Sequence, residues 1–207
     1  MKRRTSLTLS LLPALIAALL LGGCTLLPRP EAQAVSRYRI ELPPPAPATT
    51  GGEVLLLAVT RVAPGIDTPR MAYREQPGRL GYFRSARWVE DPAAMLQPVL
   101  AARLTAQPGV AAVVGRGTPL GVRHRLELEV LEFTYDLVPE QDRFLLRARL
   151  RLIDLAQRRL AVAREFEVSE PVAGKGPAAA AKAANRAVAR WLASVARFMA
   201  EGMAEAR

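Results

Sequence analysis

The most reactive side chain in this sequence is its single thiol, Cys24. It directly follows a Leu-Gly-Gly step at residues 21–23, which ends a leader with basic residues at 2–4 and an apolar run over 7–21. A basic start, a short apolar segment and small residues before a cleavage point are typical of a bacterial export signal. The apolar segment is also shorter than the roughly 20 residues that a membrane-spanning helix requires.

Residues 21–24 resemble the bacterial lipobox, in which a diacylglycerol alkylates the cysteine and the chain is cut before it. This resemblance implies a lipoprotein signal peptide at residues 1–23 and attachment to the membrane through lipidated Cys24. The alternative is an ordinary secreted protein with one leftover cysteine, but Cys24 stands where a lipobox requires it. Each buried methylene of an acyl chain contributes about 0.8 kcal/mol, so we expect firm anchoring.

Thr25 follows the lipobox cysteine where an aspartate would retain the protein in the inner membrane by enteric-type sorting. The resemblance therefore implies a periplasm-facing chain in the inner leaflet of the outer membrane. Residues 24–36 contain two prolines and no apolar period, which predicts an extended tether. Such a tether reaches about 40 Å at ~3.1 Å per residue. The folded domain is then expected at residues 37–207.

The remaining side chains do not predict an active site. The only histidine, His124, stands between two arginines in an expected strand and reads as structural or surface. The sequence has no Gly-x-Ser-x-Gly, phosphate-loop or His-Glu-x-x-His motif. Acids that could serve in acid–base chemistry are scattered over expected loops: Asp67, Glu75, Glu90 and Asp91. With Cys24 lipidated, no thiol remains for a cysteine-based metal site. Together with the missing motifs and the scattered acids, this leads us to expect no cofactor, no metal and no enzymatic activity.

The charge balance is basic, with 29 Lys and Arg against 19 Asp and Glu in 207 residues. Removing the leader lowers the net charge from +10 to +7. A basic charge balance is typical of proteins that bind nucleic acid, but the export signal argues against a nucleic-acid partner. Anionic lipid headgroups or an acidic protein face remain as partners, and a solvated arginine-rich surface is the simpler explanation. Half of the residues are apolar, which is enough for one self-supporting domain.

Short apolar runs alternate with proline-rich breaks in the first half of the domain. Residues 38–42 alternate apolar and polar side chains and predict a strand that ends at the prolines 43–45. The apolar run at 53–62 predicts a central strand that is covered, at least in part, on both faces. Residues 110–114 predict another short strand.

A hairpin and a helix are predicted next along the chain. Residues 71–74 and 80–83 flank Pro77-Gly78, a favourable turn pair. Asp91-Pro92 predicts a helix start, with Asp91 as cap and a helix over 92–106. Three leucines spaced by four residues predict its buried face, namely Leu96, Leu100 and Leu104. Pro98 removes one helical hydrogen bond and predicts a kink.

The clearest sheet signal lies at residues 123–168. The alternation of residues 126–130 slips by one residue before 131–135, as a β-bulge requires. Pairing this strand with residues 143–152 around Pro139-Glu140 brings acids opposite arginines across the hairpin. The predicted pairs are Asp136 with Arg143, Glu132 with Arg147, Glu129 with Arg149 and Glu127 with Arg151. This register predicts one charged, exposed face and one apolar face turned toward helices, with a third strand at 160–168.

The final segment predicts the longest helix, which opens at Gly176-Pro177. Its apolar residues follow helical spacing: Ala181, Ala184, Val188, Trp191, Val195, Phe198 and Met199. The helix could lie on a membrane, but the sheet needs a cover, so packing on the sheet is favoured. We therefore predict a single α/β (α+β) domain with a mixed, mostly antiparallel sheet and two main helices on one face.

Six features in a fixed order resemble the ABC-type transport auxiliary lipoproteins, the group that includes the PqiC-like components of MCE lipid-transport systems. The features are Tyr38-Arg39-Ile40, Val59 and Val62 before Pro64-Gly65, Met71-Ala72-Tyr73-Arg74 before Leu80-Gly81-Tyr82, Trp88-Val89-Glu90-Asp91-Pro92 before a leucine helix, the strand Leu126 to Phe133, and the Ala-rich last helix. The resemblance spans about residues 38–203, and Pro98 departs from it.

The resemblance implies a non-enzymatic accessory subunit that works beside an MCE-family protein, an ABC permease and an ATPase. Some family members assemble into rings, so a homo-oligomer is one expectation. Four clustered aromatics could form a partner interface, although core packing is the stronger expectation for them: Tyr73, Tyr82, Phe83 and Trp88. Two rival functions remain, namely a lipoprotein that itself carries lipid in an apolar cavity and, less favoured, an envelope hydrolase.

Overall fold

The computed structural model describes residues 34–45, 51–115, 117, 121–138 and 142–205. The predicted signal peptide, Cys24, Thr25 and most of the tether lie outside these residues, as does the Pro139-Glu140 turn. Residues 35–207 constitute one compact unit. Among the described helices, none has both the length and the hydropathy needed to cross a membrane.

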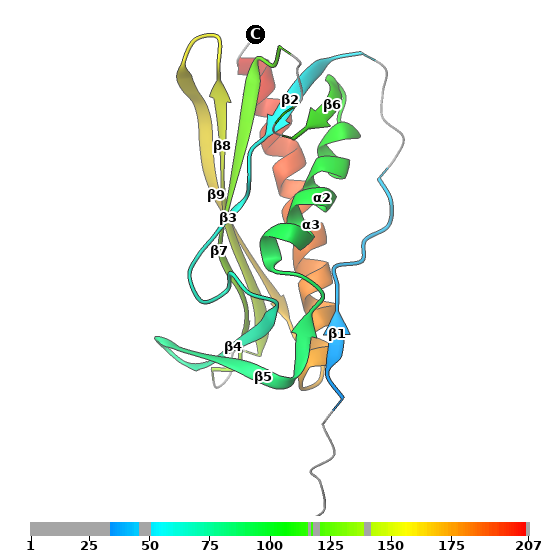
Figure 1. Ribbon diagram of the computed structural model, residues 1–207, viewed down its shortest axis with the longest axis vertical. Helices are drawn as coiled ribbons and strands as arrows, with labels where there is room; N and C mark the ends of the chain where they lie inside the picture. Colours follow the sequence, from blue (N-terminus) through cyan, green and yellow to red (C-terminus); the bar gives the residue numbers. More distant parts are fainter. Residues whose placement is uncertain (1–33, 46–50, 116, 118–120, 139–141, 206–207) are drawn as a thin grey trace, which may run out of the picture. The chain divides into compact units, whose positions relative to one another are not determined.

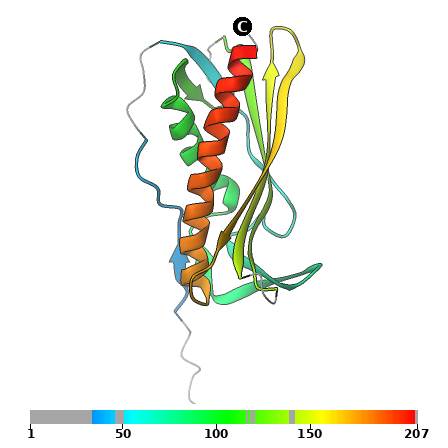
Figure 2. The ribbon, with the colours of Figure 1, turned by 180° about the vertical axis from the view of Figure 1, so that it is seen from behind.

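Nine strands form one mixed sheet, which two helices cover on one face (Figures 1 and 2). The strands are β1 (Ser36–Tyr38), β2 (Glu53–Leu57), β3 (Arg61–Val62), β4 (Arg70–Gln76), β5 (Arg79–Trp88), β6 (Val110–Val114), β7 (His124–Asp136), β8 (Arg143–Asp154) and β9 (Arg159–Pro171). The helices are α2 (Pro92–Thr105) and α3 (Pro177–Glu205). The predicted fold class is confirmed.

Strand β7 is the axis of the sheet. Along one edge it pairs antiparallel with β8, which pairs antiparallel with β9. Along the other edge it pairs in parallel with β2, β3 and β4 in succession. Strand β2 carries β6 in parallel, and the antiparallel β4–β5 hairpin carries β1 in parallel on β5. Strands distant in the sequence therefore meet along β7.

The β7–β8 pairing follows the charge pattern of the sequence. Its register is irregular between Val130 and Glu132, where the bulge was predicted. All four predicted pairs occur: Glu127 with Arg151, Glu129 with Arg149, Glu132 with Arg147 and Asp136 with Arg143. Since paired residues share a face, the acids and arginines gather on one side of the strands. The apolar residues of β7 and β8 face the helices on the other side.

Helix α2 begins as predicted, because the Asp91 Oδ1 accepts a hydrogen bond from the Ala94 amide at 3.0 Å. The three leucines Leu96, Leu100 and Leu104 are fully buried. The helix runs through Pro98 to Thr105, although Pro98 has no amide hydrogen for the Ala94 carbonyl. The seven apolar residues predicted for the buried stripe of α3 are all buried.

Three sequence expectations differ from the structure. The predicted strand at 38–42 is wrong in position, because β1 spans Ser36–Tyr38 and pairs with β5. The apolar run 53–62 is divided into β2 and β3, since residues 58–60 leave the ladder while both parts still follow β7. Strand β9 is longer than predicted and reaches Pro171, because it follows the whole length of β8.

Candidate binding surfaces

The acids considered for acid–base chemistry serve other roles. Asp91 caps α2, and the Asp67 Oδ1 accepts a hydrogen bond from the Gly65 amide at 3.1 Å. Glu75 and Glu90 are exposed on β4 and after β5. Within the described residues, no group of three or more His, Cys, Asp or Glu could hold a metal ion. The structure therefore assigns Asp67 and Asp91 to contacts with the local backbone.

His124 is buried at the start of β7, with 1% of its surface exposed. Its Nδ1 lies 2.5 Å from the Glu53 Oε2, and its Nε2 lies 4.0 Å from the Asp154 Oδ2. The Gln157 amide donates to the Asp154 Oδ1 at 2.9 Å and, with Arg123 and His124 nearby, lowers the pKa of this carboxyl despite its burial. This cluster joins the first residue of β2 to the start of β7 and the end of β8, which is a structural role.

The four aromatics of the predicted interface do not form one patch. Tyr73 and Phe83 pack against each other on the hairpin at 4.9 Å between ring centroids, and both are half-buried. Trp88 is only 2% exposed and packs on Phe133 at 5.2 Å, so it belongs to the core. Tyr82 precedes Phe83 on β5 and therefore lies on the opposite face of the hairpin.

Tyr82 is held in place on that opposite face. Its hydroxyl donates to the Gly65 carbonyl at 2.7 Å, and the Arg70 guanidinium lies 3.8 Å from its ring centroid. The half-buried Tyr82 side chain thus contacts both the loop at Gly65 and the guanidinium of Arg70. The aromatic cluster expected from the sequence is divided between a core residue, an inner pair and an outer tyrosine.

The outer face of β7–β9 carries a charged ladder. Arg149 bridges Glu129 on β7, at 3.4 Å, and Glu165 on β9, at 2.7 Å. The hydrogen bond that Arg149 donates to Glu165, together with the negative charge of Glu165, raises the pKa of Arg149. At the end of this ladder Arg74 of β4 contacts Glu132 at 2.7 Å and Asp136 at 3.0 Å. These opposite charges neutralise one another, so the charged ladder is a surface of paired ions.

An apolar groove, here called the helix groove, runs along the two helices on the other side of the sheet. Its volume is about 490 Å³. Its walls come from the segment 42–45, α2 and α3, and they are lined by Leu42, Pro43, Pro44, Pro45, Pro98, Val99, Ala102, Arg103, Ala189 and Leu192. The Nε of Arg103 is buried and has no hydrogen-bond partner among the described residues. An apolar wall that includes an arginine whose Nε lacks a partner among the described residues suits an anionic amphiphile.

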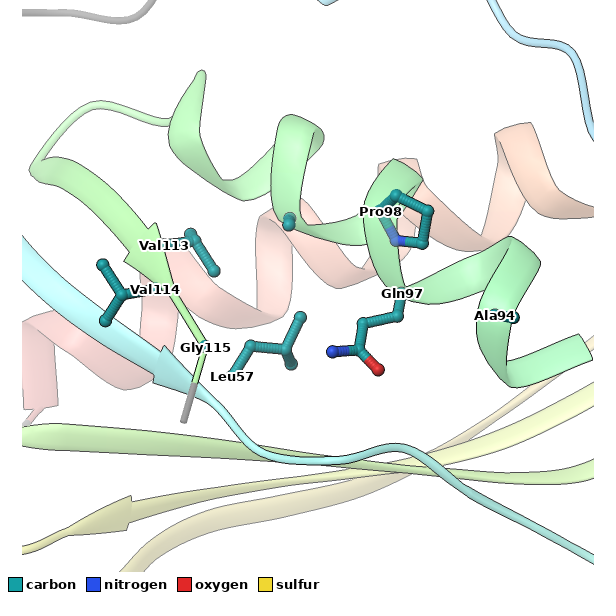
Figure 3. Close-up of a pocket in the computed structure, with 8 residues that line it drawn as sticks. Leu57, Ala94, Gln97, Pro98, Val113, Val114 and Gly115 are labelled. Atoms are coloured by element: carbon teal, nitrogen blue, oxygen red, sulfur yellow. The ribbon is translucent and has the colours of Figure 1, made fainter. Parts of the chain in front are cut away.

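A smaller hollow of about 270 Å³ lies between α2 and the ends of β2 and β6 (Figure 3). Gln97 reaches into it toward Leu57, and the Thr60 hydroxyl donates to the Gln97 Oε1 at 3.3 Å. Pro98 lines both this hollow and the helix groove. The proline that departs from a regular helix therefore lies between the two depressions of this face.

Neither depression was predicted from the sequence. The walls of the helix groove come from three segments separated by more than fifty residues, and no local pattern brings them together. The one available signal was Pro98, a proline within an otherwise amphipathic helix.

The comparisons with known proteins agree with the fold. The family described as the ABC-type transport auxiliary lipoprotein component matches residues 38–196, and this chain belongs to that family. A crystal structure of a Xanthomonas campestris protein from the DUF330 family is 23% identical, with a TM-score of 0.72, and covers 83% of this chain and 98% of that chain. No curated protein matches the chain.

Two further structures are more distant. An uncharacterized protein is 18% identical, with a TM-score of 0.65, and covers 80% of this chain and 99% of that chain. A PelC dodecamer from Paraburkholderia phytofirmans is 16% identical, with a TM-score of 0.43, and covers 70% of this chain and 89% of that chain. The first of these supports the fold alone, and the second is too distant to support a conclusion about this chain.

Proposed function

We propose that this chain is a lipid-anchored accessory subunit of an MCE-type ABC transport system that moves lipids or other hydrophobic compounds across the bacterial envelope. It works by docking to an MCE-family protein and to the ABC permease and ATPase, without catalysis. The observation that carries the proposal is the family match over residues 38–196.

The proposed anchor is the lipidated Cys24, which follows the signal peptide at residues 1–23. Residues 24–36 act as the tether, and residues 37–207 act as the docking domain facing the periplasm. Thr25 supports the inner leaflet of the outer membrane as the site of attachment. This arrangement requires neither cofactor nor metal.

The tip of the β4–β5 hairpin is our proposed docking surface for a protein partner or for a second copy of the chain. Leu80 is 39% exposed beside the turn, and the half-buried pair Tyr73 and Phe83 supports the hairpin beneath it. Aromatic residues are enriched in the cores of protein interfaces. Trp88 has a supporting role, since its packing on Phe133 holds the base of β5 in the core.

Photocrosslinking in native membranes tests this surface. A photoreactive residue at Leu80 is expected to crosslink a component of the transport system or a second copy. The matched control is Leu160 on β9, which is 53% exposed but lies away from the hairpin. Equal crosslinking from both positions, or none from Leu80, would remove the hairpin from the proposal.

A second candidate function is direct lipid carriage, and the helix groove favours it. A volume of about 490 Å³ lies within the range of roughly 300–1,000 Å³ typical of ligand sites. Its lining is apolar except for Arg103, whose Nε lacks a partner among the described residues. An acyl chain would lie along Val99 and Leu192, with its anionic headgroup at Arg103.

Filling the groove tests lipid carriage. Ala189 is exposed and lines the groove, so Ala189→Trp should fill it without disturbing the core. Ala193 is exposed on the same helix but outside the groove, so Ala193→Trp is the control. Mass spectrometry should detect a lipid that co-purifies with the wild type and with the control but is lost from Ala189→Trp. Equal lipid content in both variants, or none in the wild type, would rule out this function.

A further inference from the structure

Three arginines lie side by side across three neighbouring strands. Arg37 of β1 is paired with Arg87 of β5, and Arg87 is also paired with Arg70 of β4. Residues paired in this way place their side chains on the same face of the sheet. Like charges directly opposite each other on neighbouring strands are destabilising. This set is here called the arginine row. Repulsion between its like charges destabilises the folded state, and folding alone does not explain why the three arginines lie together.

The arginine row lacks the carboxylate partners that Arg74 of β4 and Arg149 of β8 have. Arg74 and Arg149 each contact two carboxylates on neighbouring strands. In contrast, the arginines of the row are exposed and make no ion pair with any described residue. Only Arg70 has a compensating contact, with its guanidinium over the ring of Tyr82. Three unneutralised guanidinium groups on one face form a site for phosphate or carboxylate oxygens.

The surroundings of the arginine row are basic and partly apolar. Val35 and Val89, just outside β1 and β5, are 44% and 37% exposed. A hollow of about 360 Å³ beside β1 is lined by Arg37, by Lys182 and by Arg39, which is paired with Glu41 at 2.6 Å. Exposed valines beside cations match the interface of a bilayer, where apolar side chains enter the headgroup layer and cations meet the phosphates.

The arginine row also stands next to the tether. Strand β1 begins at Ser36, only 12 residues after Cys24, the proposed site of lipid attachment. A tether of this length keeps the first strand within about 40 Å of the bilayer surface. The arginine row, whose first member Arg37 lies on β1, is therefore within reach of the lipid headgroups.

We propose that the arginine row binds the anionic headgroups of the bilayer to which the chain is anchored, and so docks the domain against the membrane. This inference rests on the proposed anchoring through Cys24. Each Lys or Arg near an anionic surface strengthens membrane binding about fivefold. The three arginines together therefore shift the equilibrium between undocked and docked domains toward the docked state by on the order of 100-fold.

Energy transfer in proteoliposomes tests the proposal on the full lipidated protein. A donor dye attached at Gln76→Cys, exposed near the hairpin turn, reports on an acceptor dye at the vesicle surface. In vesicles containing phosphatidylglycerol, transfer should exceed that in pure phosphatidylcholine vesicles. High salt should remove the difference, because charges at the surface are screened over about 3 Å at 1 M salt.

The triple variant Arg37→Gln, Arg70→Gln, Arg87→Gln should lose the difference between the two vesicle types. The control variant changes three exposed arginines outside the arginine row to Gln, namely Arg158 and Arg159 at the β8–β9 turn and Arg197 on α3, and should retain the difference. Equal transfer in both vesicle types for the wild type would overturn the proposal. A triple variant that still docks would also overturn it. The same holds for a triple variant that docks as well as the wild type but loses a co-purifying protein.

Flotation with neutral vesicles separates this test from that of the anchor. A lipidated chain floats with pure phosphatidylcholine whether or not the arginine row binds. Failure to float would contradict the anchor at Cys24, whereas flotation without any effect of phosphatidylglycerol would contradict only the arginine row.

Discussion

At the scale of single residues, Gly81 shows how one missing side chain shapes the hairpin. The ring of Tyr73 lies across Gly81, which is its partner on β5. A Cβ at Gly81 would come within 2.6 Å of the Tyr73 Cζ, closer than any real contact. Glycine therefore lets the aromatic ring lie flat on the neighbouring strand, where it meets Phe83.

Gly81→Ala is expected to lower the free energy of unfolding by about 1–3 kcal/mol, because the ring of Tyr73 must move to accommodate the new methyl group. Urea denaturation measures the change. Gly121→Ala is the control, since a Cβ at Gly121 meets nothing within 4 Å and should leave stability nearly unchanged. Equal stability of the two variants would contradict the close packing of Tyr73 on Gly81.

Asp154 gives stability a predictable dependence on pH. Its pKa is lowered from 3.8 chiefly by the hydrogen bond from the Gln157 amide, with Arg123 and His124 adding to the effect. A carboxyl with a lowered pKa in the folded state stabilises the protein above the unfolded pKa, and this contribution is lost as the pH falls through the folded value. The wild type should therefore lose the benefit of Asp154 below about pH 4.

Asp154→Asn should accordingly be less stable than the wild type at neutral pH, and the difference should shrink as the solution is acidified. Urea denaturation at a series of pH values measures both curves. Glu75→Gln, at an exposed position on β4, should follow the wild-type curve throughout. A difference for Asp154→Asn that stays constant or grows on acidification would contradict the role assigned to this carboxylate.

At the scale of elements, Arg74 fastens the β4–β5 hairpin to the central strand. Its guanidinium contacts Glu132 and Asp136 of β7, whose side chains are 14% and 2% exposed. These hydrogen bonds and charges raise the pKa of Arg74, led by the bond to Asp136. Because the parallel contact between β4 and β7 is short, this ion pair is a main connection between the two.

Arg74→Ala should destabilise the domain by about 2–3 kcal/mol, because it leaves two largely buried carboxylates short of a partner. The matched control is Arg164→Ala, whose contact to Glu201 at 3.4 Å joins side chains that are 49% and 60% exposed. An exposed pair contributes only about 0–1 kcal/mol. Thermal unfolding measures the loss of stability in both variants. Equal losses would show that Arg74 does not hold the β4–β5 hairpin against β7.

Local charge patterns were sufficient to predict the long antiparallel strands. The slip before Leu131 and the alternating acids and arginines allowed one register for β7 and β8, and that register is confirmed. The cap at Asp91 and the leucines of α2 were equally local signals. In each case one stretch of sequence contains both the pattern and its consequence.

Parallel pairing could not be predicted in the same way. Strands β2, β3 and β4 each pair with residues of β7 that are more than 60 positions away, and no side-chain pattern specifies the order of these strands. The arginine row and the helix groove both depend on such distant contacts. For the same reason the sequence suggested one aromatic cluster, whereas strand alternation divides Tyr82 from Phe83 and burial removes Trp88.

At the scale of the whole domain, the two faces of the sheet differ in what covers them and in the charges that they carry. One face is covered by α2 and α3, with the helix groove between them and the segment 42–45. The other face carries a neutralised charged ladder on β7–β9 and, on β1, β4 and β5, an arginine row without counterions. Proposed contacts with lipid therefore fall on both faces of the sheet, and the proposed contact with protein falls at the tip of the β4–β5 hairpin.

The central claim is that this anchored, non-catalytic domain works as part of a transport complex. The most direct test is affinity capture of the full-length protein from native membranes, followed by mass spectrometry of everything retained. We expect an MCE-family protein together with an ABC permease and ATPase, and a captured chain that begins at an acylated Cys24. Repeated capture of an unmodified chain without any of these components would contradict the account.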